Sequence, residues 1–316
     1  MATVFTKIAL PEMLDRGYDR KLASASIAIA GTLAVMIPPS ALMVVYGILT
    51  DSSIGKLLIA GIIPGIVFAI LICVVTLLAV WRRPELAPVQ RHSYSLYEKL
   101  WALRLTGPLL LIIFSVISGL YLGVFTPTEA GAIGALSTLL LAWVRQRSWR
   151  RLEVGKALLE TVRASSMIFG IIICALLLSK FLALSGVTAT VGEWMTGLEV
   201  NRWVIILIIV VIYLVFGMMM DAPALLAISL PITHPVALAL GFDPIWFGIF
   251  VVVLVEIGAV TPPVGINCFV VQAASGNRVK LEEVFSGLVP FVGAGLLMLL
   301  LMCLFPQMAL YLPGKM

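Results

Sequence analysis

Two pairs of adjacent prolines, Pro38-Pro39 and Pro262-Pro263, interrupt long apolar stretches of this chain. Proline lacks a backbone N–H and clashes with the preceding helical turn, so each pair predicts a break in a helix. A break leaves free carbonyl oxygens on one side and free N–H groups on the other. The carbonyl end of a helix favours a cation, and the N–H end favours a carboxylate. The two breaks therefore predict cation sites beside an anion site.

Oxygen-bearing side chains lie near both breaks, with Thr32 and Ser40 at the first and Thr261 and Asn267 at the second. Hydroxyl and amide oxygens suit a hard cation such as Na⁺. The alternative is that both proline pairs are kinks without ligands. Their matched positions in the chain favour binding sites over simple kinks.

Asp221 and Glu256 are the acidic residues predicted nearest to membrane depth. A carboxylate there is costly unless it pairs or binds an ion, so a functional role is the default interpretation. Asp221 is predicted at the tip of a hairpin, where it either ligates a cation or forms a hydrogen bond. Glu256 precedes the second break, where it either ligates a cation, pairs with a basic residue or caps the broken backbone.

The surroundings of the two breaks form an internal repeat. Residues 11–39 and 235–263 carry the same pattern of proline, glycine and aspartate at a constant separation of 224 positions. The matched pairs are Pro11 and Pro235, Gly17 and Gly241, Asp19 and Asp243, and Pro38 and Pro262. In an apolar chain, repeated broken helices are typical of a transporter whose two halves form a site near the membrane midplane.

The composition predicts an all-α, polytopic membrane protein. Of the 316 residues, 61% are hydrophobic and 12% are charged, and the mean hydropathy is +1.13, which is too apolar for a soluble domain. Basic residues cluster between apolar stretches, where they set orientation in a lipid bilayer, so the net charge of +5 does not indicate a nucleic-acid partner. The chain shows no phosphate loop, transition-metal ligand spacing or nucleophile–base set. We therefore expect no enzyme activity and no cofactor, with an ion gradient as the driving force.

Three regions are predicted along the chain. Residues 1–92 hold the remainder of the first repeat, which comprises the end of a hairpin, a broken helix at 22–49 and a span at 56–80. Residues 93–163 hold scaffold spans and a basic interfacial helix. The expected elements of this middle region are an amphipathic segment at 94–104, spans at 105–124 and 127–144, and the basic helix at 145–163.

The third region, residues 164–316, holds the second repeat, with a hairpin at about 217–242, a broken helix at 245–275 and a last span at 284–305. Two basic segments, 82–91 and 145–163, are separated by two spans and are therefore both predicted on the cytoplasmic side. Thr126, Pro127 and Glu129 predict a capped start for the span at 127–144, because they match a capping box with proline at the first helical position.

The repeat also bears on the start of the chain. At the same separation Met1 corresponds to Leu225, so the first repeat has no counterpart of the region around Gly217 and Asp221. We expect from this that the chain is shortened relative to a complete protein with two full repeats. The alternative is a naturally asymmetric protein.

The chain resembles the large membrane subunit of the tripartite ATP-independent periplasmic (TRAP) transporters. The resemblance is carried by stretches spread over almost the whole chain in family order, including the Gly-Met-Met-Met-Asp run that ends at Asp221 and the Thr-Pro-Pro run that starts at Thr261. The matching stretches are 11–19, 31–40, 53–64, 123–130, 217–221 and 256–265.

This resemblance implies a Na⁺-coupled secondary active transporter with the inverted-repeat, elevator fold of the ion-transporter superfamily, in a bacterial or archaeal inner membrane. It implies import of an organic acid, such as a C4-dicarboxylate or a sugar acid, delivered by a periplasmic binding protein. A small four-helix membrane subunit would complete the scaffold. One Na⁺ site is implied near residues 31–40, and another near Asp221 and residues 256–265.

Carried over by position, the implied cation-binding residues are Gly31, Thr32, Pro38, Ser40, Asp221, Glu256, Gly258 and Thr261. The implied substrate-binding residues are Pro39, Ser40, Pro262, Pro263, Gly265 and Asn267. Two alternatives stay open: a carboxylate carrier of the same superfamily that works without a binding protein, and a truncated membrane fragment that does not transport.

Overall fold

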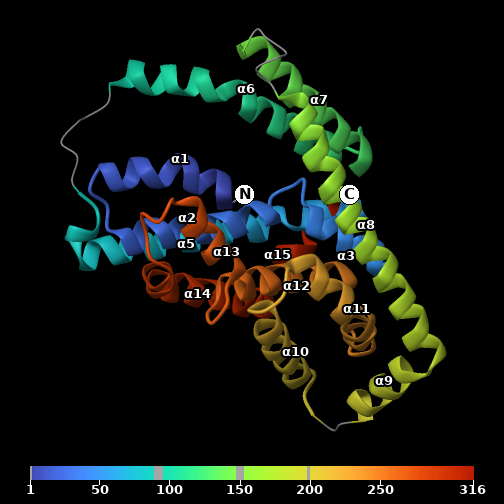
Figure 1. Cartoon of the computed structure of the whole chain (residues 1–316). Coiled ribbons are helices and arrows are strands. Elements are labelled where there is room, and N and C mark those ends of the chain that lie inside the picture. Colours follow the sequence, from blue (N-terminus) through green and yellow to red (C-terminus); the bar gives the residue numbers. More distant parts are fainter. Residues whose placement is uncertain (1, 89–94, 147–152, 198–199) are drawn as a thin grey trace. The chain divides into compact units, whose positions relative to one another are not determined.

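The computed structural model describes residues 2–88, 95–146, 153–197 and 200–316. Every regular element within these ranges is a helix, and none is a strand. The helices fall into two compact units, one formed by residues 1–88 with 171–315 and the other centred on residues 89–170. Figure 1 shows the chain with its elements labelled.

The first copy of the repeat is a run of helices in the larger unit. Its elements are α1 (Ala2–Asp15), α2 (Arg20–Met36), α3 (Ala41–Thr50), α4 (Ile54–Ala60), α5 (Ile62–Arg82) and η1 (Pro84–Leu86). The carboxylate of Asp19 starts α2 by accepting a hydrogen bond from the backbone N–H of Leu22 at 3.0 Å. Ile37 is extended and ends α2, and α3 then leaves at an angle of 46°. The break predicted at Pro38-Pro39 is therefore present.

The second copy repeats this succession. Its elements, with those that follow it, are α10 (Arg202–Gly217), α11 (Ala222–Ala239), α12 (Pro244–Val260), α13 (Ile266–Ala274), α14 (Leu281–Leu304), α15 (Gln307–Leu310) and η3 (Pro313–Lys315). The carboxylate of Asp243 starts α12 by accepting hydrogen bonds from the N–H groups of Ile245 and Trp246 at 2.7 and 3.1 Å. Thr261 is extended and ends α12 at the second predicted break.

The repeat in sequence is a repeat in local structure. The first residues of α2 and α12 are 224 positions apart, and so are their last residues. The turn before each helix contains a glycine with positive φ, +83° at Gly17 and +79° at Gly241, a conformation in which glycine carries no steric cost. The Pro38-Pro39 and Pro262-Pro263 peptide bonds are both cis.

Helix α12 forms the centre of the larger unit. Each of its residues from Ile245 to Val260 is buried, as expected for a helix that is hydrophobic all round. It contacts α10, α11 and α14 of its own half and α2, α3 and α4 of the first copy. The ring of Tyr46 on α3 lies where a side chain on Gly248 would be, and its phenol donates a hydrogen bond to the carbonyl of Pro244 at 2.9 Å.

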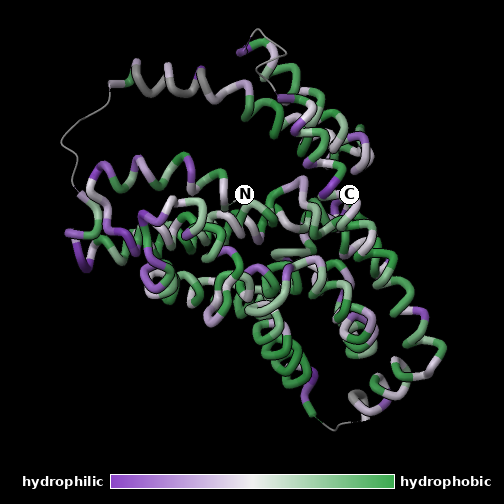
Figure 2. Tube along the Cα trace, viewed as in Figure 1, coloured by the Kyte–Doolittle hydropathy of each residue, from purple (hydrophilic) through white to green (hydrophobic). Residues whose placement is uncertain are grey.

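Beside α12, α14 packs along α2 and α5. Gly287 permits this approach, because a side chain there would collide with the backbone carbonyl of Lys21. In the same unit α9 (Val187–Gly197) packs against α11. Figure 2 shows apolar residues along most of these helices, with hydrophilic residues gathered where α1 joins α2 and where α5 ends.

The smaller unit contains α6 (Leu96–Tyr121), α7 (Pro127–Gln146) and the first part of α8 (Val154–Leu184). Helices α6 and α7 pack against each other. The predicted capping box is confirmed: the N–H of Thr126 donates to the carboxylate of Glu129 at 2.8 Å, and the N–H of Glu129 donates to the hydroxyl of Thr126 at 3.3 Å.

Two expected boundaries differ in the structure. The amphipathic segment and span expected at 94–104 and 105–124 are joined in one helix, α6. Residues 154–163 of the expected interfacial helix continue without interruption into α8, while residues 147–152 lie outside the described ranges. No proline occurs between Pro127 and Pro223 to stop α8, so hydrogen bonding propagates through the change from basic to apolar sequence.

Several described helices are long and apolar enough to cross a membrane. They comprise residues 54–82 (α4 with α5), α7, α8, α11 and α14, and the bent pair α2 and α3 adds a sixth candidate. The prediction of an all-α, polytopic membrane protein is confirmed.

Candidate functional site

A cavity of about 140 Å³ lies where the two copies of the repeat meet the tip of the hairpin formed by α10 and α11. The first copy contributes Ala2 from α1 and Gly31 and Val35 from α2. The second contributes residues from the hairpin tip, α12 and the start of α13. These are Met220, Asp221, Ala222, Glu256, Ala259, Ile266 and Asn267. We call this space the carboxylate cavity.

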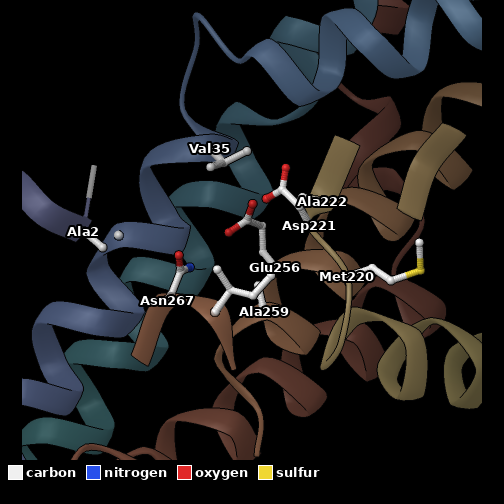
Figure 3. Close-up of a pocket in the computed structure, with 10 residues that line it drawn as sticks. Ala2, Val35, Met220, Asp221, Ala222, Glu256, Ala259 and Asn267 are labelled. Carbon is white, nitrogen blue, oxygen red and sulfur yellow. The ribbon is translucent and has the colours of Figure 1, made fainter. Parts of the chain in front are cut away.

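Figure 3 shows the carboxylates of Asp221 and Glu256 turned toward the same space. Asp221 is the N-cap position of α11, but its side chain makes no capping hydrogen bond. Glu256 lies about one turn before the end of α12, and the residue is only 6% exposed. Neither carboxylate forms a hydrogen bond or ion pair with another residue in the described part of the chain. The alternatives that Asp221 forms a hydrogen bond at the hairpin tip, and that Glu256 pairs with a basic residue or caps the broken backbone, are therefore not observed among the described residues.

Two carboxylates that share a cavity of low dielectric repel each other, and a cation between them removes the repulsion. The cavity has room for an ion and several water molecules. Hard cations take carboxylate, amide and carbonyl oxygens as ligands, and the amide of Asn267 stands at the edge of the same space. The arrangement is suited to a hard cation. Within the described residues no three His, Cys, Asp or Glu side chains gather as a metal centre.

Close contact between glycines brings the two acids together. A Cβ atom on Gly258 would lie 2.9 Å from the Cα of Gly217, and one on Gly217 would lie 3.1 Å from the Cα of Gly258. Real Cβ atoms do not occupy such positions without a shift of the backbone. Further along the same junction, the N–H of Gly265 donates to the carbonyl of Met218 at 3.2 Å. The hairpin tip is therefore tied to both sides of the second break.

The hydroxyl groups predicted near the breaks bond to their own helices. Thr32 is buried and donates to the carbonyl of Ile29 at 2.7 Å. Thr261 donates to the carbonyl of Ile257 at 2.6 Å. Ser40 is buried as the N-cap of α3, where its oxygen accepts from the N–H of Met43 at 3.4 Å. None of these three residues lines the carboxylate cavity.

Of the residues implied as ligands, the structure brings Gly31, Asp221, Glu256 and Asn267 to one cavity. The prolines of the breaks lie outside its wall; Pro38 is buried, whereas Pro39, Pro262 and Pro263 are exposed. Gly265 is buried with a left-handed φ of +53° that starts the turn into α13. Gly258 does not line the cavity; it contacts Gly217 of the hairpin.

Sequence reasoning missed the small and apolar residues of the wall. Val35 lies one helical turn after Gly31, and Ala259 lies three residues after Glu256, so helical periodicity alone would place each pair on one face. Ala2 carries no such signal. It lies in the wall because α1 packs closely on Gly31, where an added Cβ would come within 3.1 Å of the Ala2 side chain.

Residues 1–308 match the family described as "Tripartite ATP-independent periplasmic transporter, DctM component". The chain is 36% identical to the C4-dicarboxylate TRAP transporter large permease protein DctM of Pseudomonas aeruginosa, over 97% of this chain and 71% of that protein. It is 32% identical to the protein of the same name in Rhodobacter capsulatus, over 97% and 72%. It is 31% identical to the isethionate TRAP transporter permease protein DctMQ of Oleidesulfovibrio alaskensis, over 97% and 48%.

Proposed function

Because the chain belongs to the DctM family of TRAP transporter large permeases, we propose that it carries an organic acid across the membrane together with Na⁺. Members of this family are permease subunits of the inner membrane, so the chain is a multi-pass membrane protein and not an enzyme. Resemblance to the TRAP family was predicted from the sequence and is confirmed. Na⁺ coupling, the identity of the acid and the partners are the proposed part.

The pairing of Asp221 with Glu256 in one cavity is the observation that carries the cation proposal. Two carboxylates without described partners at membrane depth are costly, and a bound monovalent cation offsets that cost in the loaded state. If the two carboxylates are stable at membrane depth only with a cation bound, the site crosses the membrane only in its cation-bound form. Movement of the protein is then coupled to movement of the ion. In this proposal the hairpin and the broken helix move as one body, as in an elevator.

The organic acid is proposed to bind beside the cation, at the starts of α13 and α3. Both helices begin directly after a break, and a helix N-terminus presents free N–H groups and the positive end of its dipole. Asn267, in the first turn of α13, adds an amide that can bind a carboxylate oxygen. The relatives are named for C4-dicarboxylates and isethionate, which are both small organic anions. A C4-dicarboxylate is the first substrate to test, and a sugar acid the second.

Two partners complete the proposal. The family description is tripartite, which supports a periplasmic binding protein that delivers the acid and a small four-helix membrane subunit. One relative is named DctMQ, a name that adds a second letter to DctM. This supports a second membrane component that works with the large permease. The exposed apolar surfaces of the helices then face either lipid or this small subunit.

The test is uptake into proteoliposomes that contain the chain, its small subunit and the binding protein. Labelled succinate should accumulate when external Na⁺ exceeds internal Na⁺, and replacement of Na⁺ by choline should stop it. Uptake that is the same in choline would overturn Na⁺ coupling. Uptake that persists without the binding protein would instead favour a carrier that works alone.

A further inference from the structure

A second pocket, of about 350 Å³, lies in the larger unit between the start of α2, the end of α5 and the first half of α14. It shares no residue with the carboxylate cavity. Three cationic side chains line it, those of Lys21, Arg82 and Arg83. We call it the basic pocket. The start of α2 and the end of α5, which form it, lie where Figure 2 shows hydrophilic residues gathered.

The positive charges of the basic pocket are not balanced by its own acids. Asp19 is the single acid in its lining, and its carboxylate already accepts the capping hydrogen bond from Leu22. The side chains of Lys21, Arg82 and Arg83 form no ion pair or hydrogen bond with any residue in the part of the chain that the structure describes. The pocket therefore has an excess of positive charge and free donors.

Apart from Ser286, the rest of the pocket wall is apolar. Leu22 and Ala79 flank the cations, and Phe291 of α14 closes the inner side with only 1% of its surface exposed. A free inorganic anion would gain nothing from such a wall. An amphipathic anion would bury its hydrocarbon against the wall while its charged group meets the three cations.

The position of the pocket along α5 matches the level of lipid headgroups. Helix α5 completes an apolar span that ends at Arg82. The preceding Trp81 is 79% exposed, and tryptophan at the end of a span marks the membrane–water interface. The basic loop that follows was predicted on the cytoplasmic side, where anionic phospholipids attract lysine and arginine.

Local helix chemistry explains only some of these cations. Arg82 and Arg83 at the end of α5 complement the helix dipole and also act as orientation signals. Lys21 is in the first turn of α2, where a cation faces the positive end of the dipole. An external anion would remove that unfavourable interaction, and it would also account for the convergence of cations from two separate helices on one hollow.

We propose that the basic pocket binds the phosphate of an anionic phospholipid headgroup, with one acyl chain along Leu22, Ala79 and Phe291. The lipid would bridge α2, α5 and α14 at their cytoplasmic ends. This proposal does not depend on Na⁺ coupling or on the identity of the transported acid, because it concerns a different pocket and is tested without transport.

The experiment is a titration of the purified full chain in neutral detergent with dioleoyl phosphatidylglycerol, followed by native mass spectrometry. The triple variant Lys21→Gln/Arg82→Gln/Arg83→Gln should bind the lipid about tenfold or more weakly, since each cation near an anionic headgroup contributes to binding. The matched control, Lys7→Gln/Lys56→Gln/Lys180→Gln, removes the same charge from residues outside the pocket lining and should bind as the parent does. Equal weakening by both triple variants would overturn a specific site.

A second variant tests the apolar wall and protects the experiment against a triple variant that does not fold. Ala79→Phe fills the pocket and keeps all three cations, so it should weaken binding of phosphatidylglycerol. Unchanged binding would overturn the pocket as the lipid site.

Phosphatidylcholine should bind more weakly than phosphatidylglycerol to the parent, and equal binding would contradict recognition of an anion. If inorganic phosphate displaces the lipid completely and binds equally well to Ala79→Phe, the ligand is free phosphate and the lipid assignment is wrong.

Discussion

Gly217 and Gly258 touch backbone to backbone, at the point where the hairpin crosses the broken helix α12. This contact places the hairpin tip, and with it Asp221, beside Glu256. The geometry of the site thus depends on two glycines, which have no side chain to bind a ligand. Substitution at either glycine tests the geometry of the junction and leaves every side chain that lines the cavity in place.

Gly258→Ala should push the hairpin away from α12, because its Cβ would come within 2.9 Å of the Gly217 backbone. We expect a loss of about 1–3 kcal/mol in stability, as for other insertions into a packed core, together with weaker Na⁺ binding. Thermal unfolding in detergent measures the first effect. The control is Gly293→Ala on α14, where an added Cβ meets no atom within 4 Å and where alanine favours the helix. If the two variants melted at the same temperature, the close contact would not matter.

Asp221→Asn and Glu256→Gln should each weaken Na⁺ binding by about tenfold or more, because a charge-assisted contact is worth about 1.5–3 kcal/mol. Binding of ²²Na⁺ to the purified protein measures this directly and does not require transport. Glu282→Gln, on the exposed face of α14, is the matched control and should leave the affinity as it was. Parental affinity in both carboxylate variants would exclude the cavity as the cation site.

Tyr46→Phe removes the hydrogen bond from α3 of the first copy to the carbonyl of Pro244 in the second. The expected loss is about 1 kcal/mol, because the ring itself still fills the space beside Gly248. Thermal unfolding should show a lower midpoint for this variant than for Tyr97→Phe on α6, because Tyr97 is 77% exposed. A midpoint equal to that of the control would show that the Tyr46 hydroxyl contributes nothing to the joining of the copies.

The two arms of the hairpin share a buried hydroxyl cluster, in which the phenol of Tyr213 lies 2.9 Å from the hydroxyl of Thr233 and 2.7 Å from that of Ser229. Tyr213→Phe and Ser229→Ala should each destabilise the hairpin. In a double-mutant cycle their effects should be less than additive by about 0.5–3 kcal/mol, because both remove the same hydrogen bond. Strict additivity in thermal unfolding would mean that the two hydroxyls act independently.

The helix ends and breaks were predictable because local chemistry determines them. Asp19 and Asp243 cap their helices in the same way, proline stops α2 and α12, and the capping box at Thr126 forms as its residues indicate. These features depend on residues within a few positions of one another. The all-helical class followed from composition for the same reason, since the bilayer permits little else to so apolar a chain.

The interior of the site was not predictable in this way. Thr32 and Thr261 have hydroxyls that suit a cation, yet both donate to a carbonyl of their own helix. A rotamer that does so and one that faces a cavity are equally compatible with the sequence, and tertiary packing selects between them. Ala2 lines the site through packing alone, since its side chain has no polar atom and no periodic relation to the other residues of the wall.

Helix α12 has no face left for lipid, since its residues from Ile245 to Val260 are covered by helices from both halves. During synthesis the ribosome completes α2, α3 and α4 long before α12, whereas α14 emerges only afterwards. The contacts of α2, α3 and α4 with α12 can therefore form only after most of the chain has been made. Because α14 follows α12 in the chain, the burial of α12 by helices of both halves is complete only after α14 has been made.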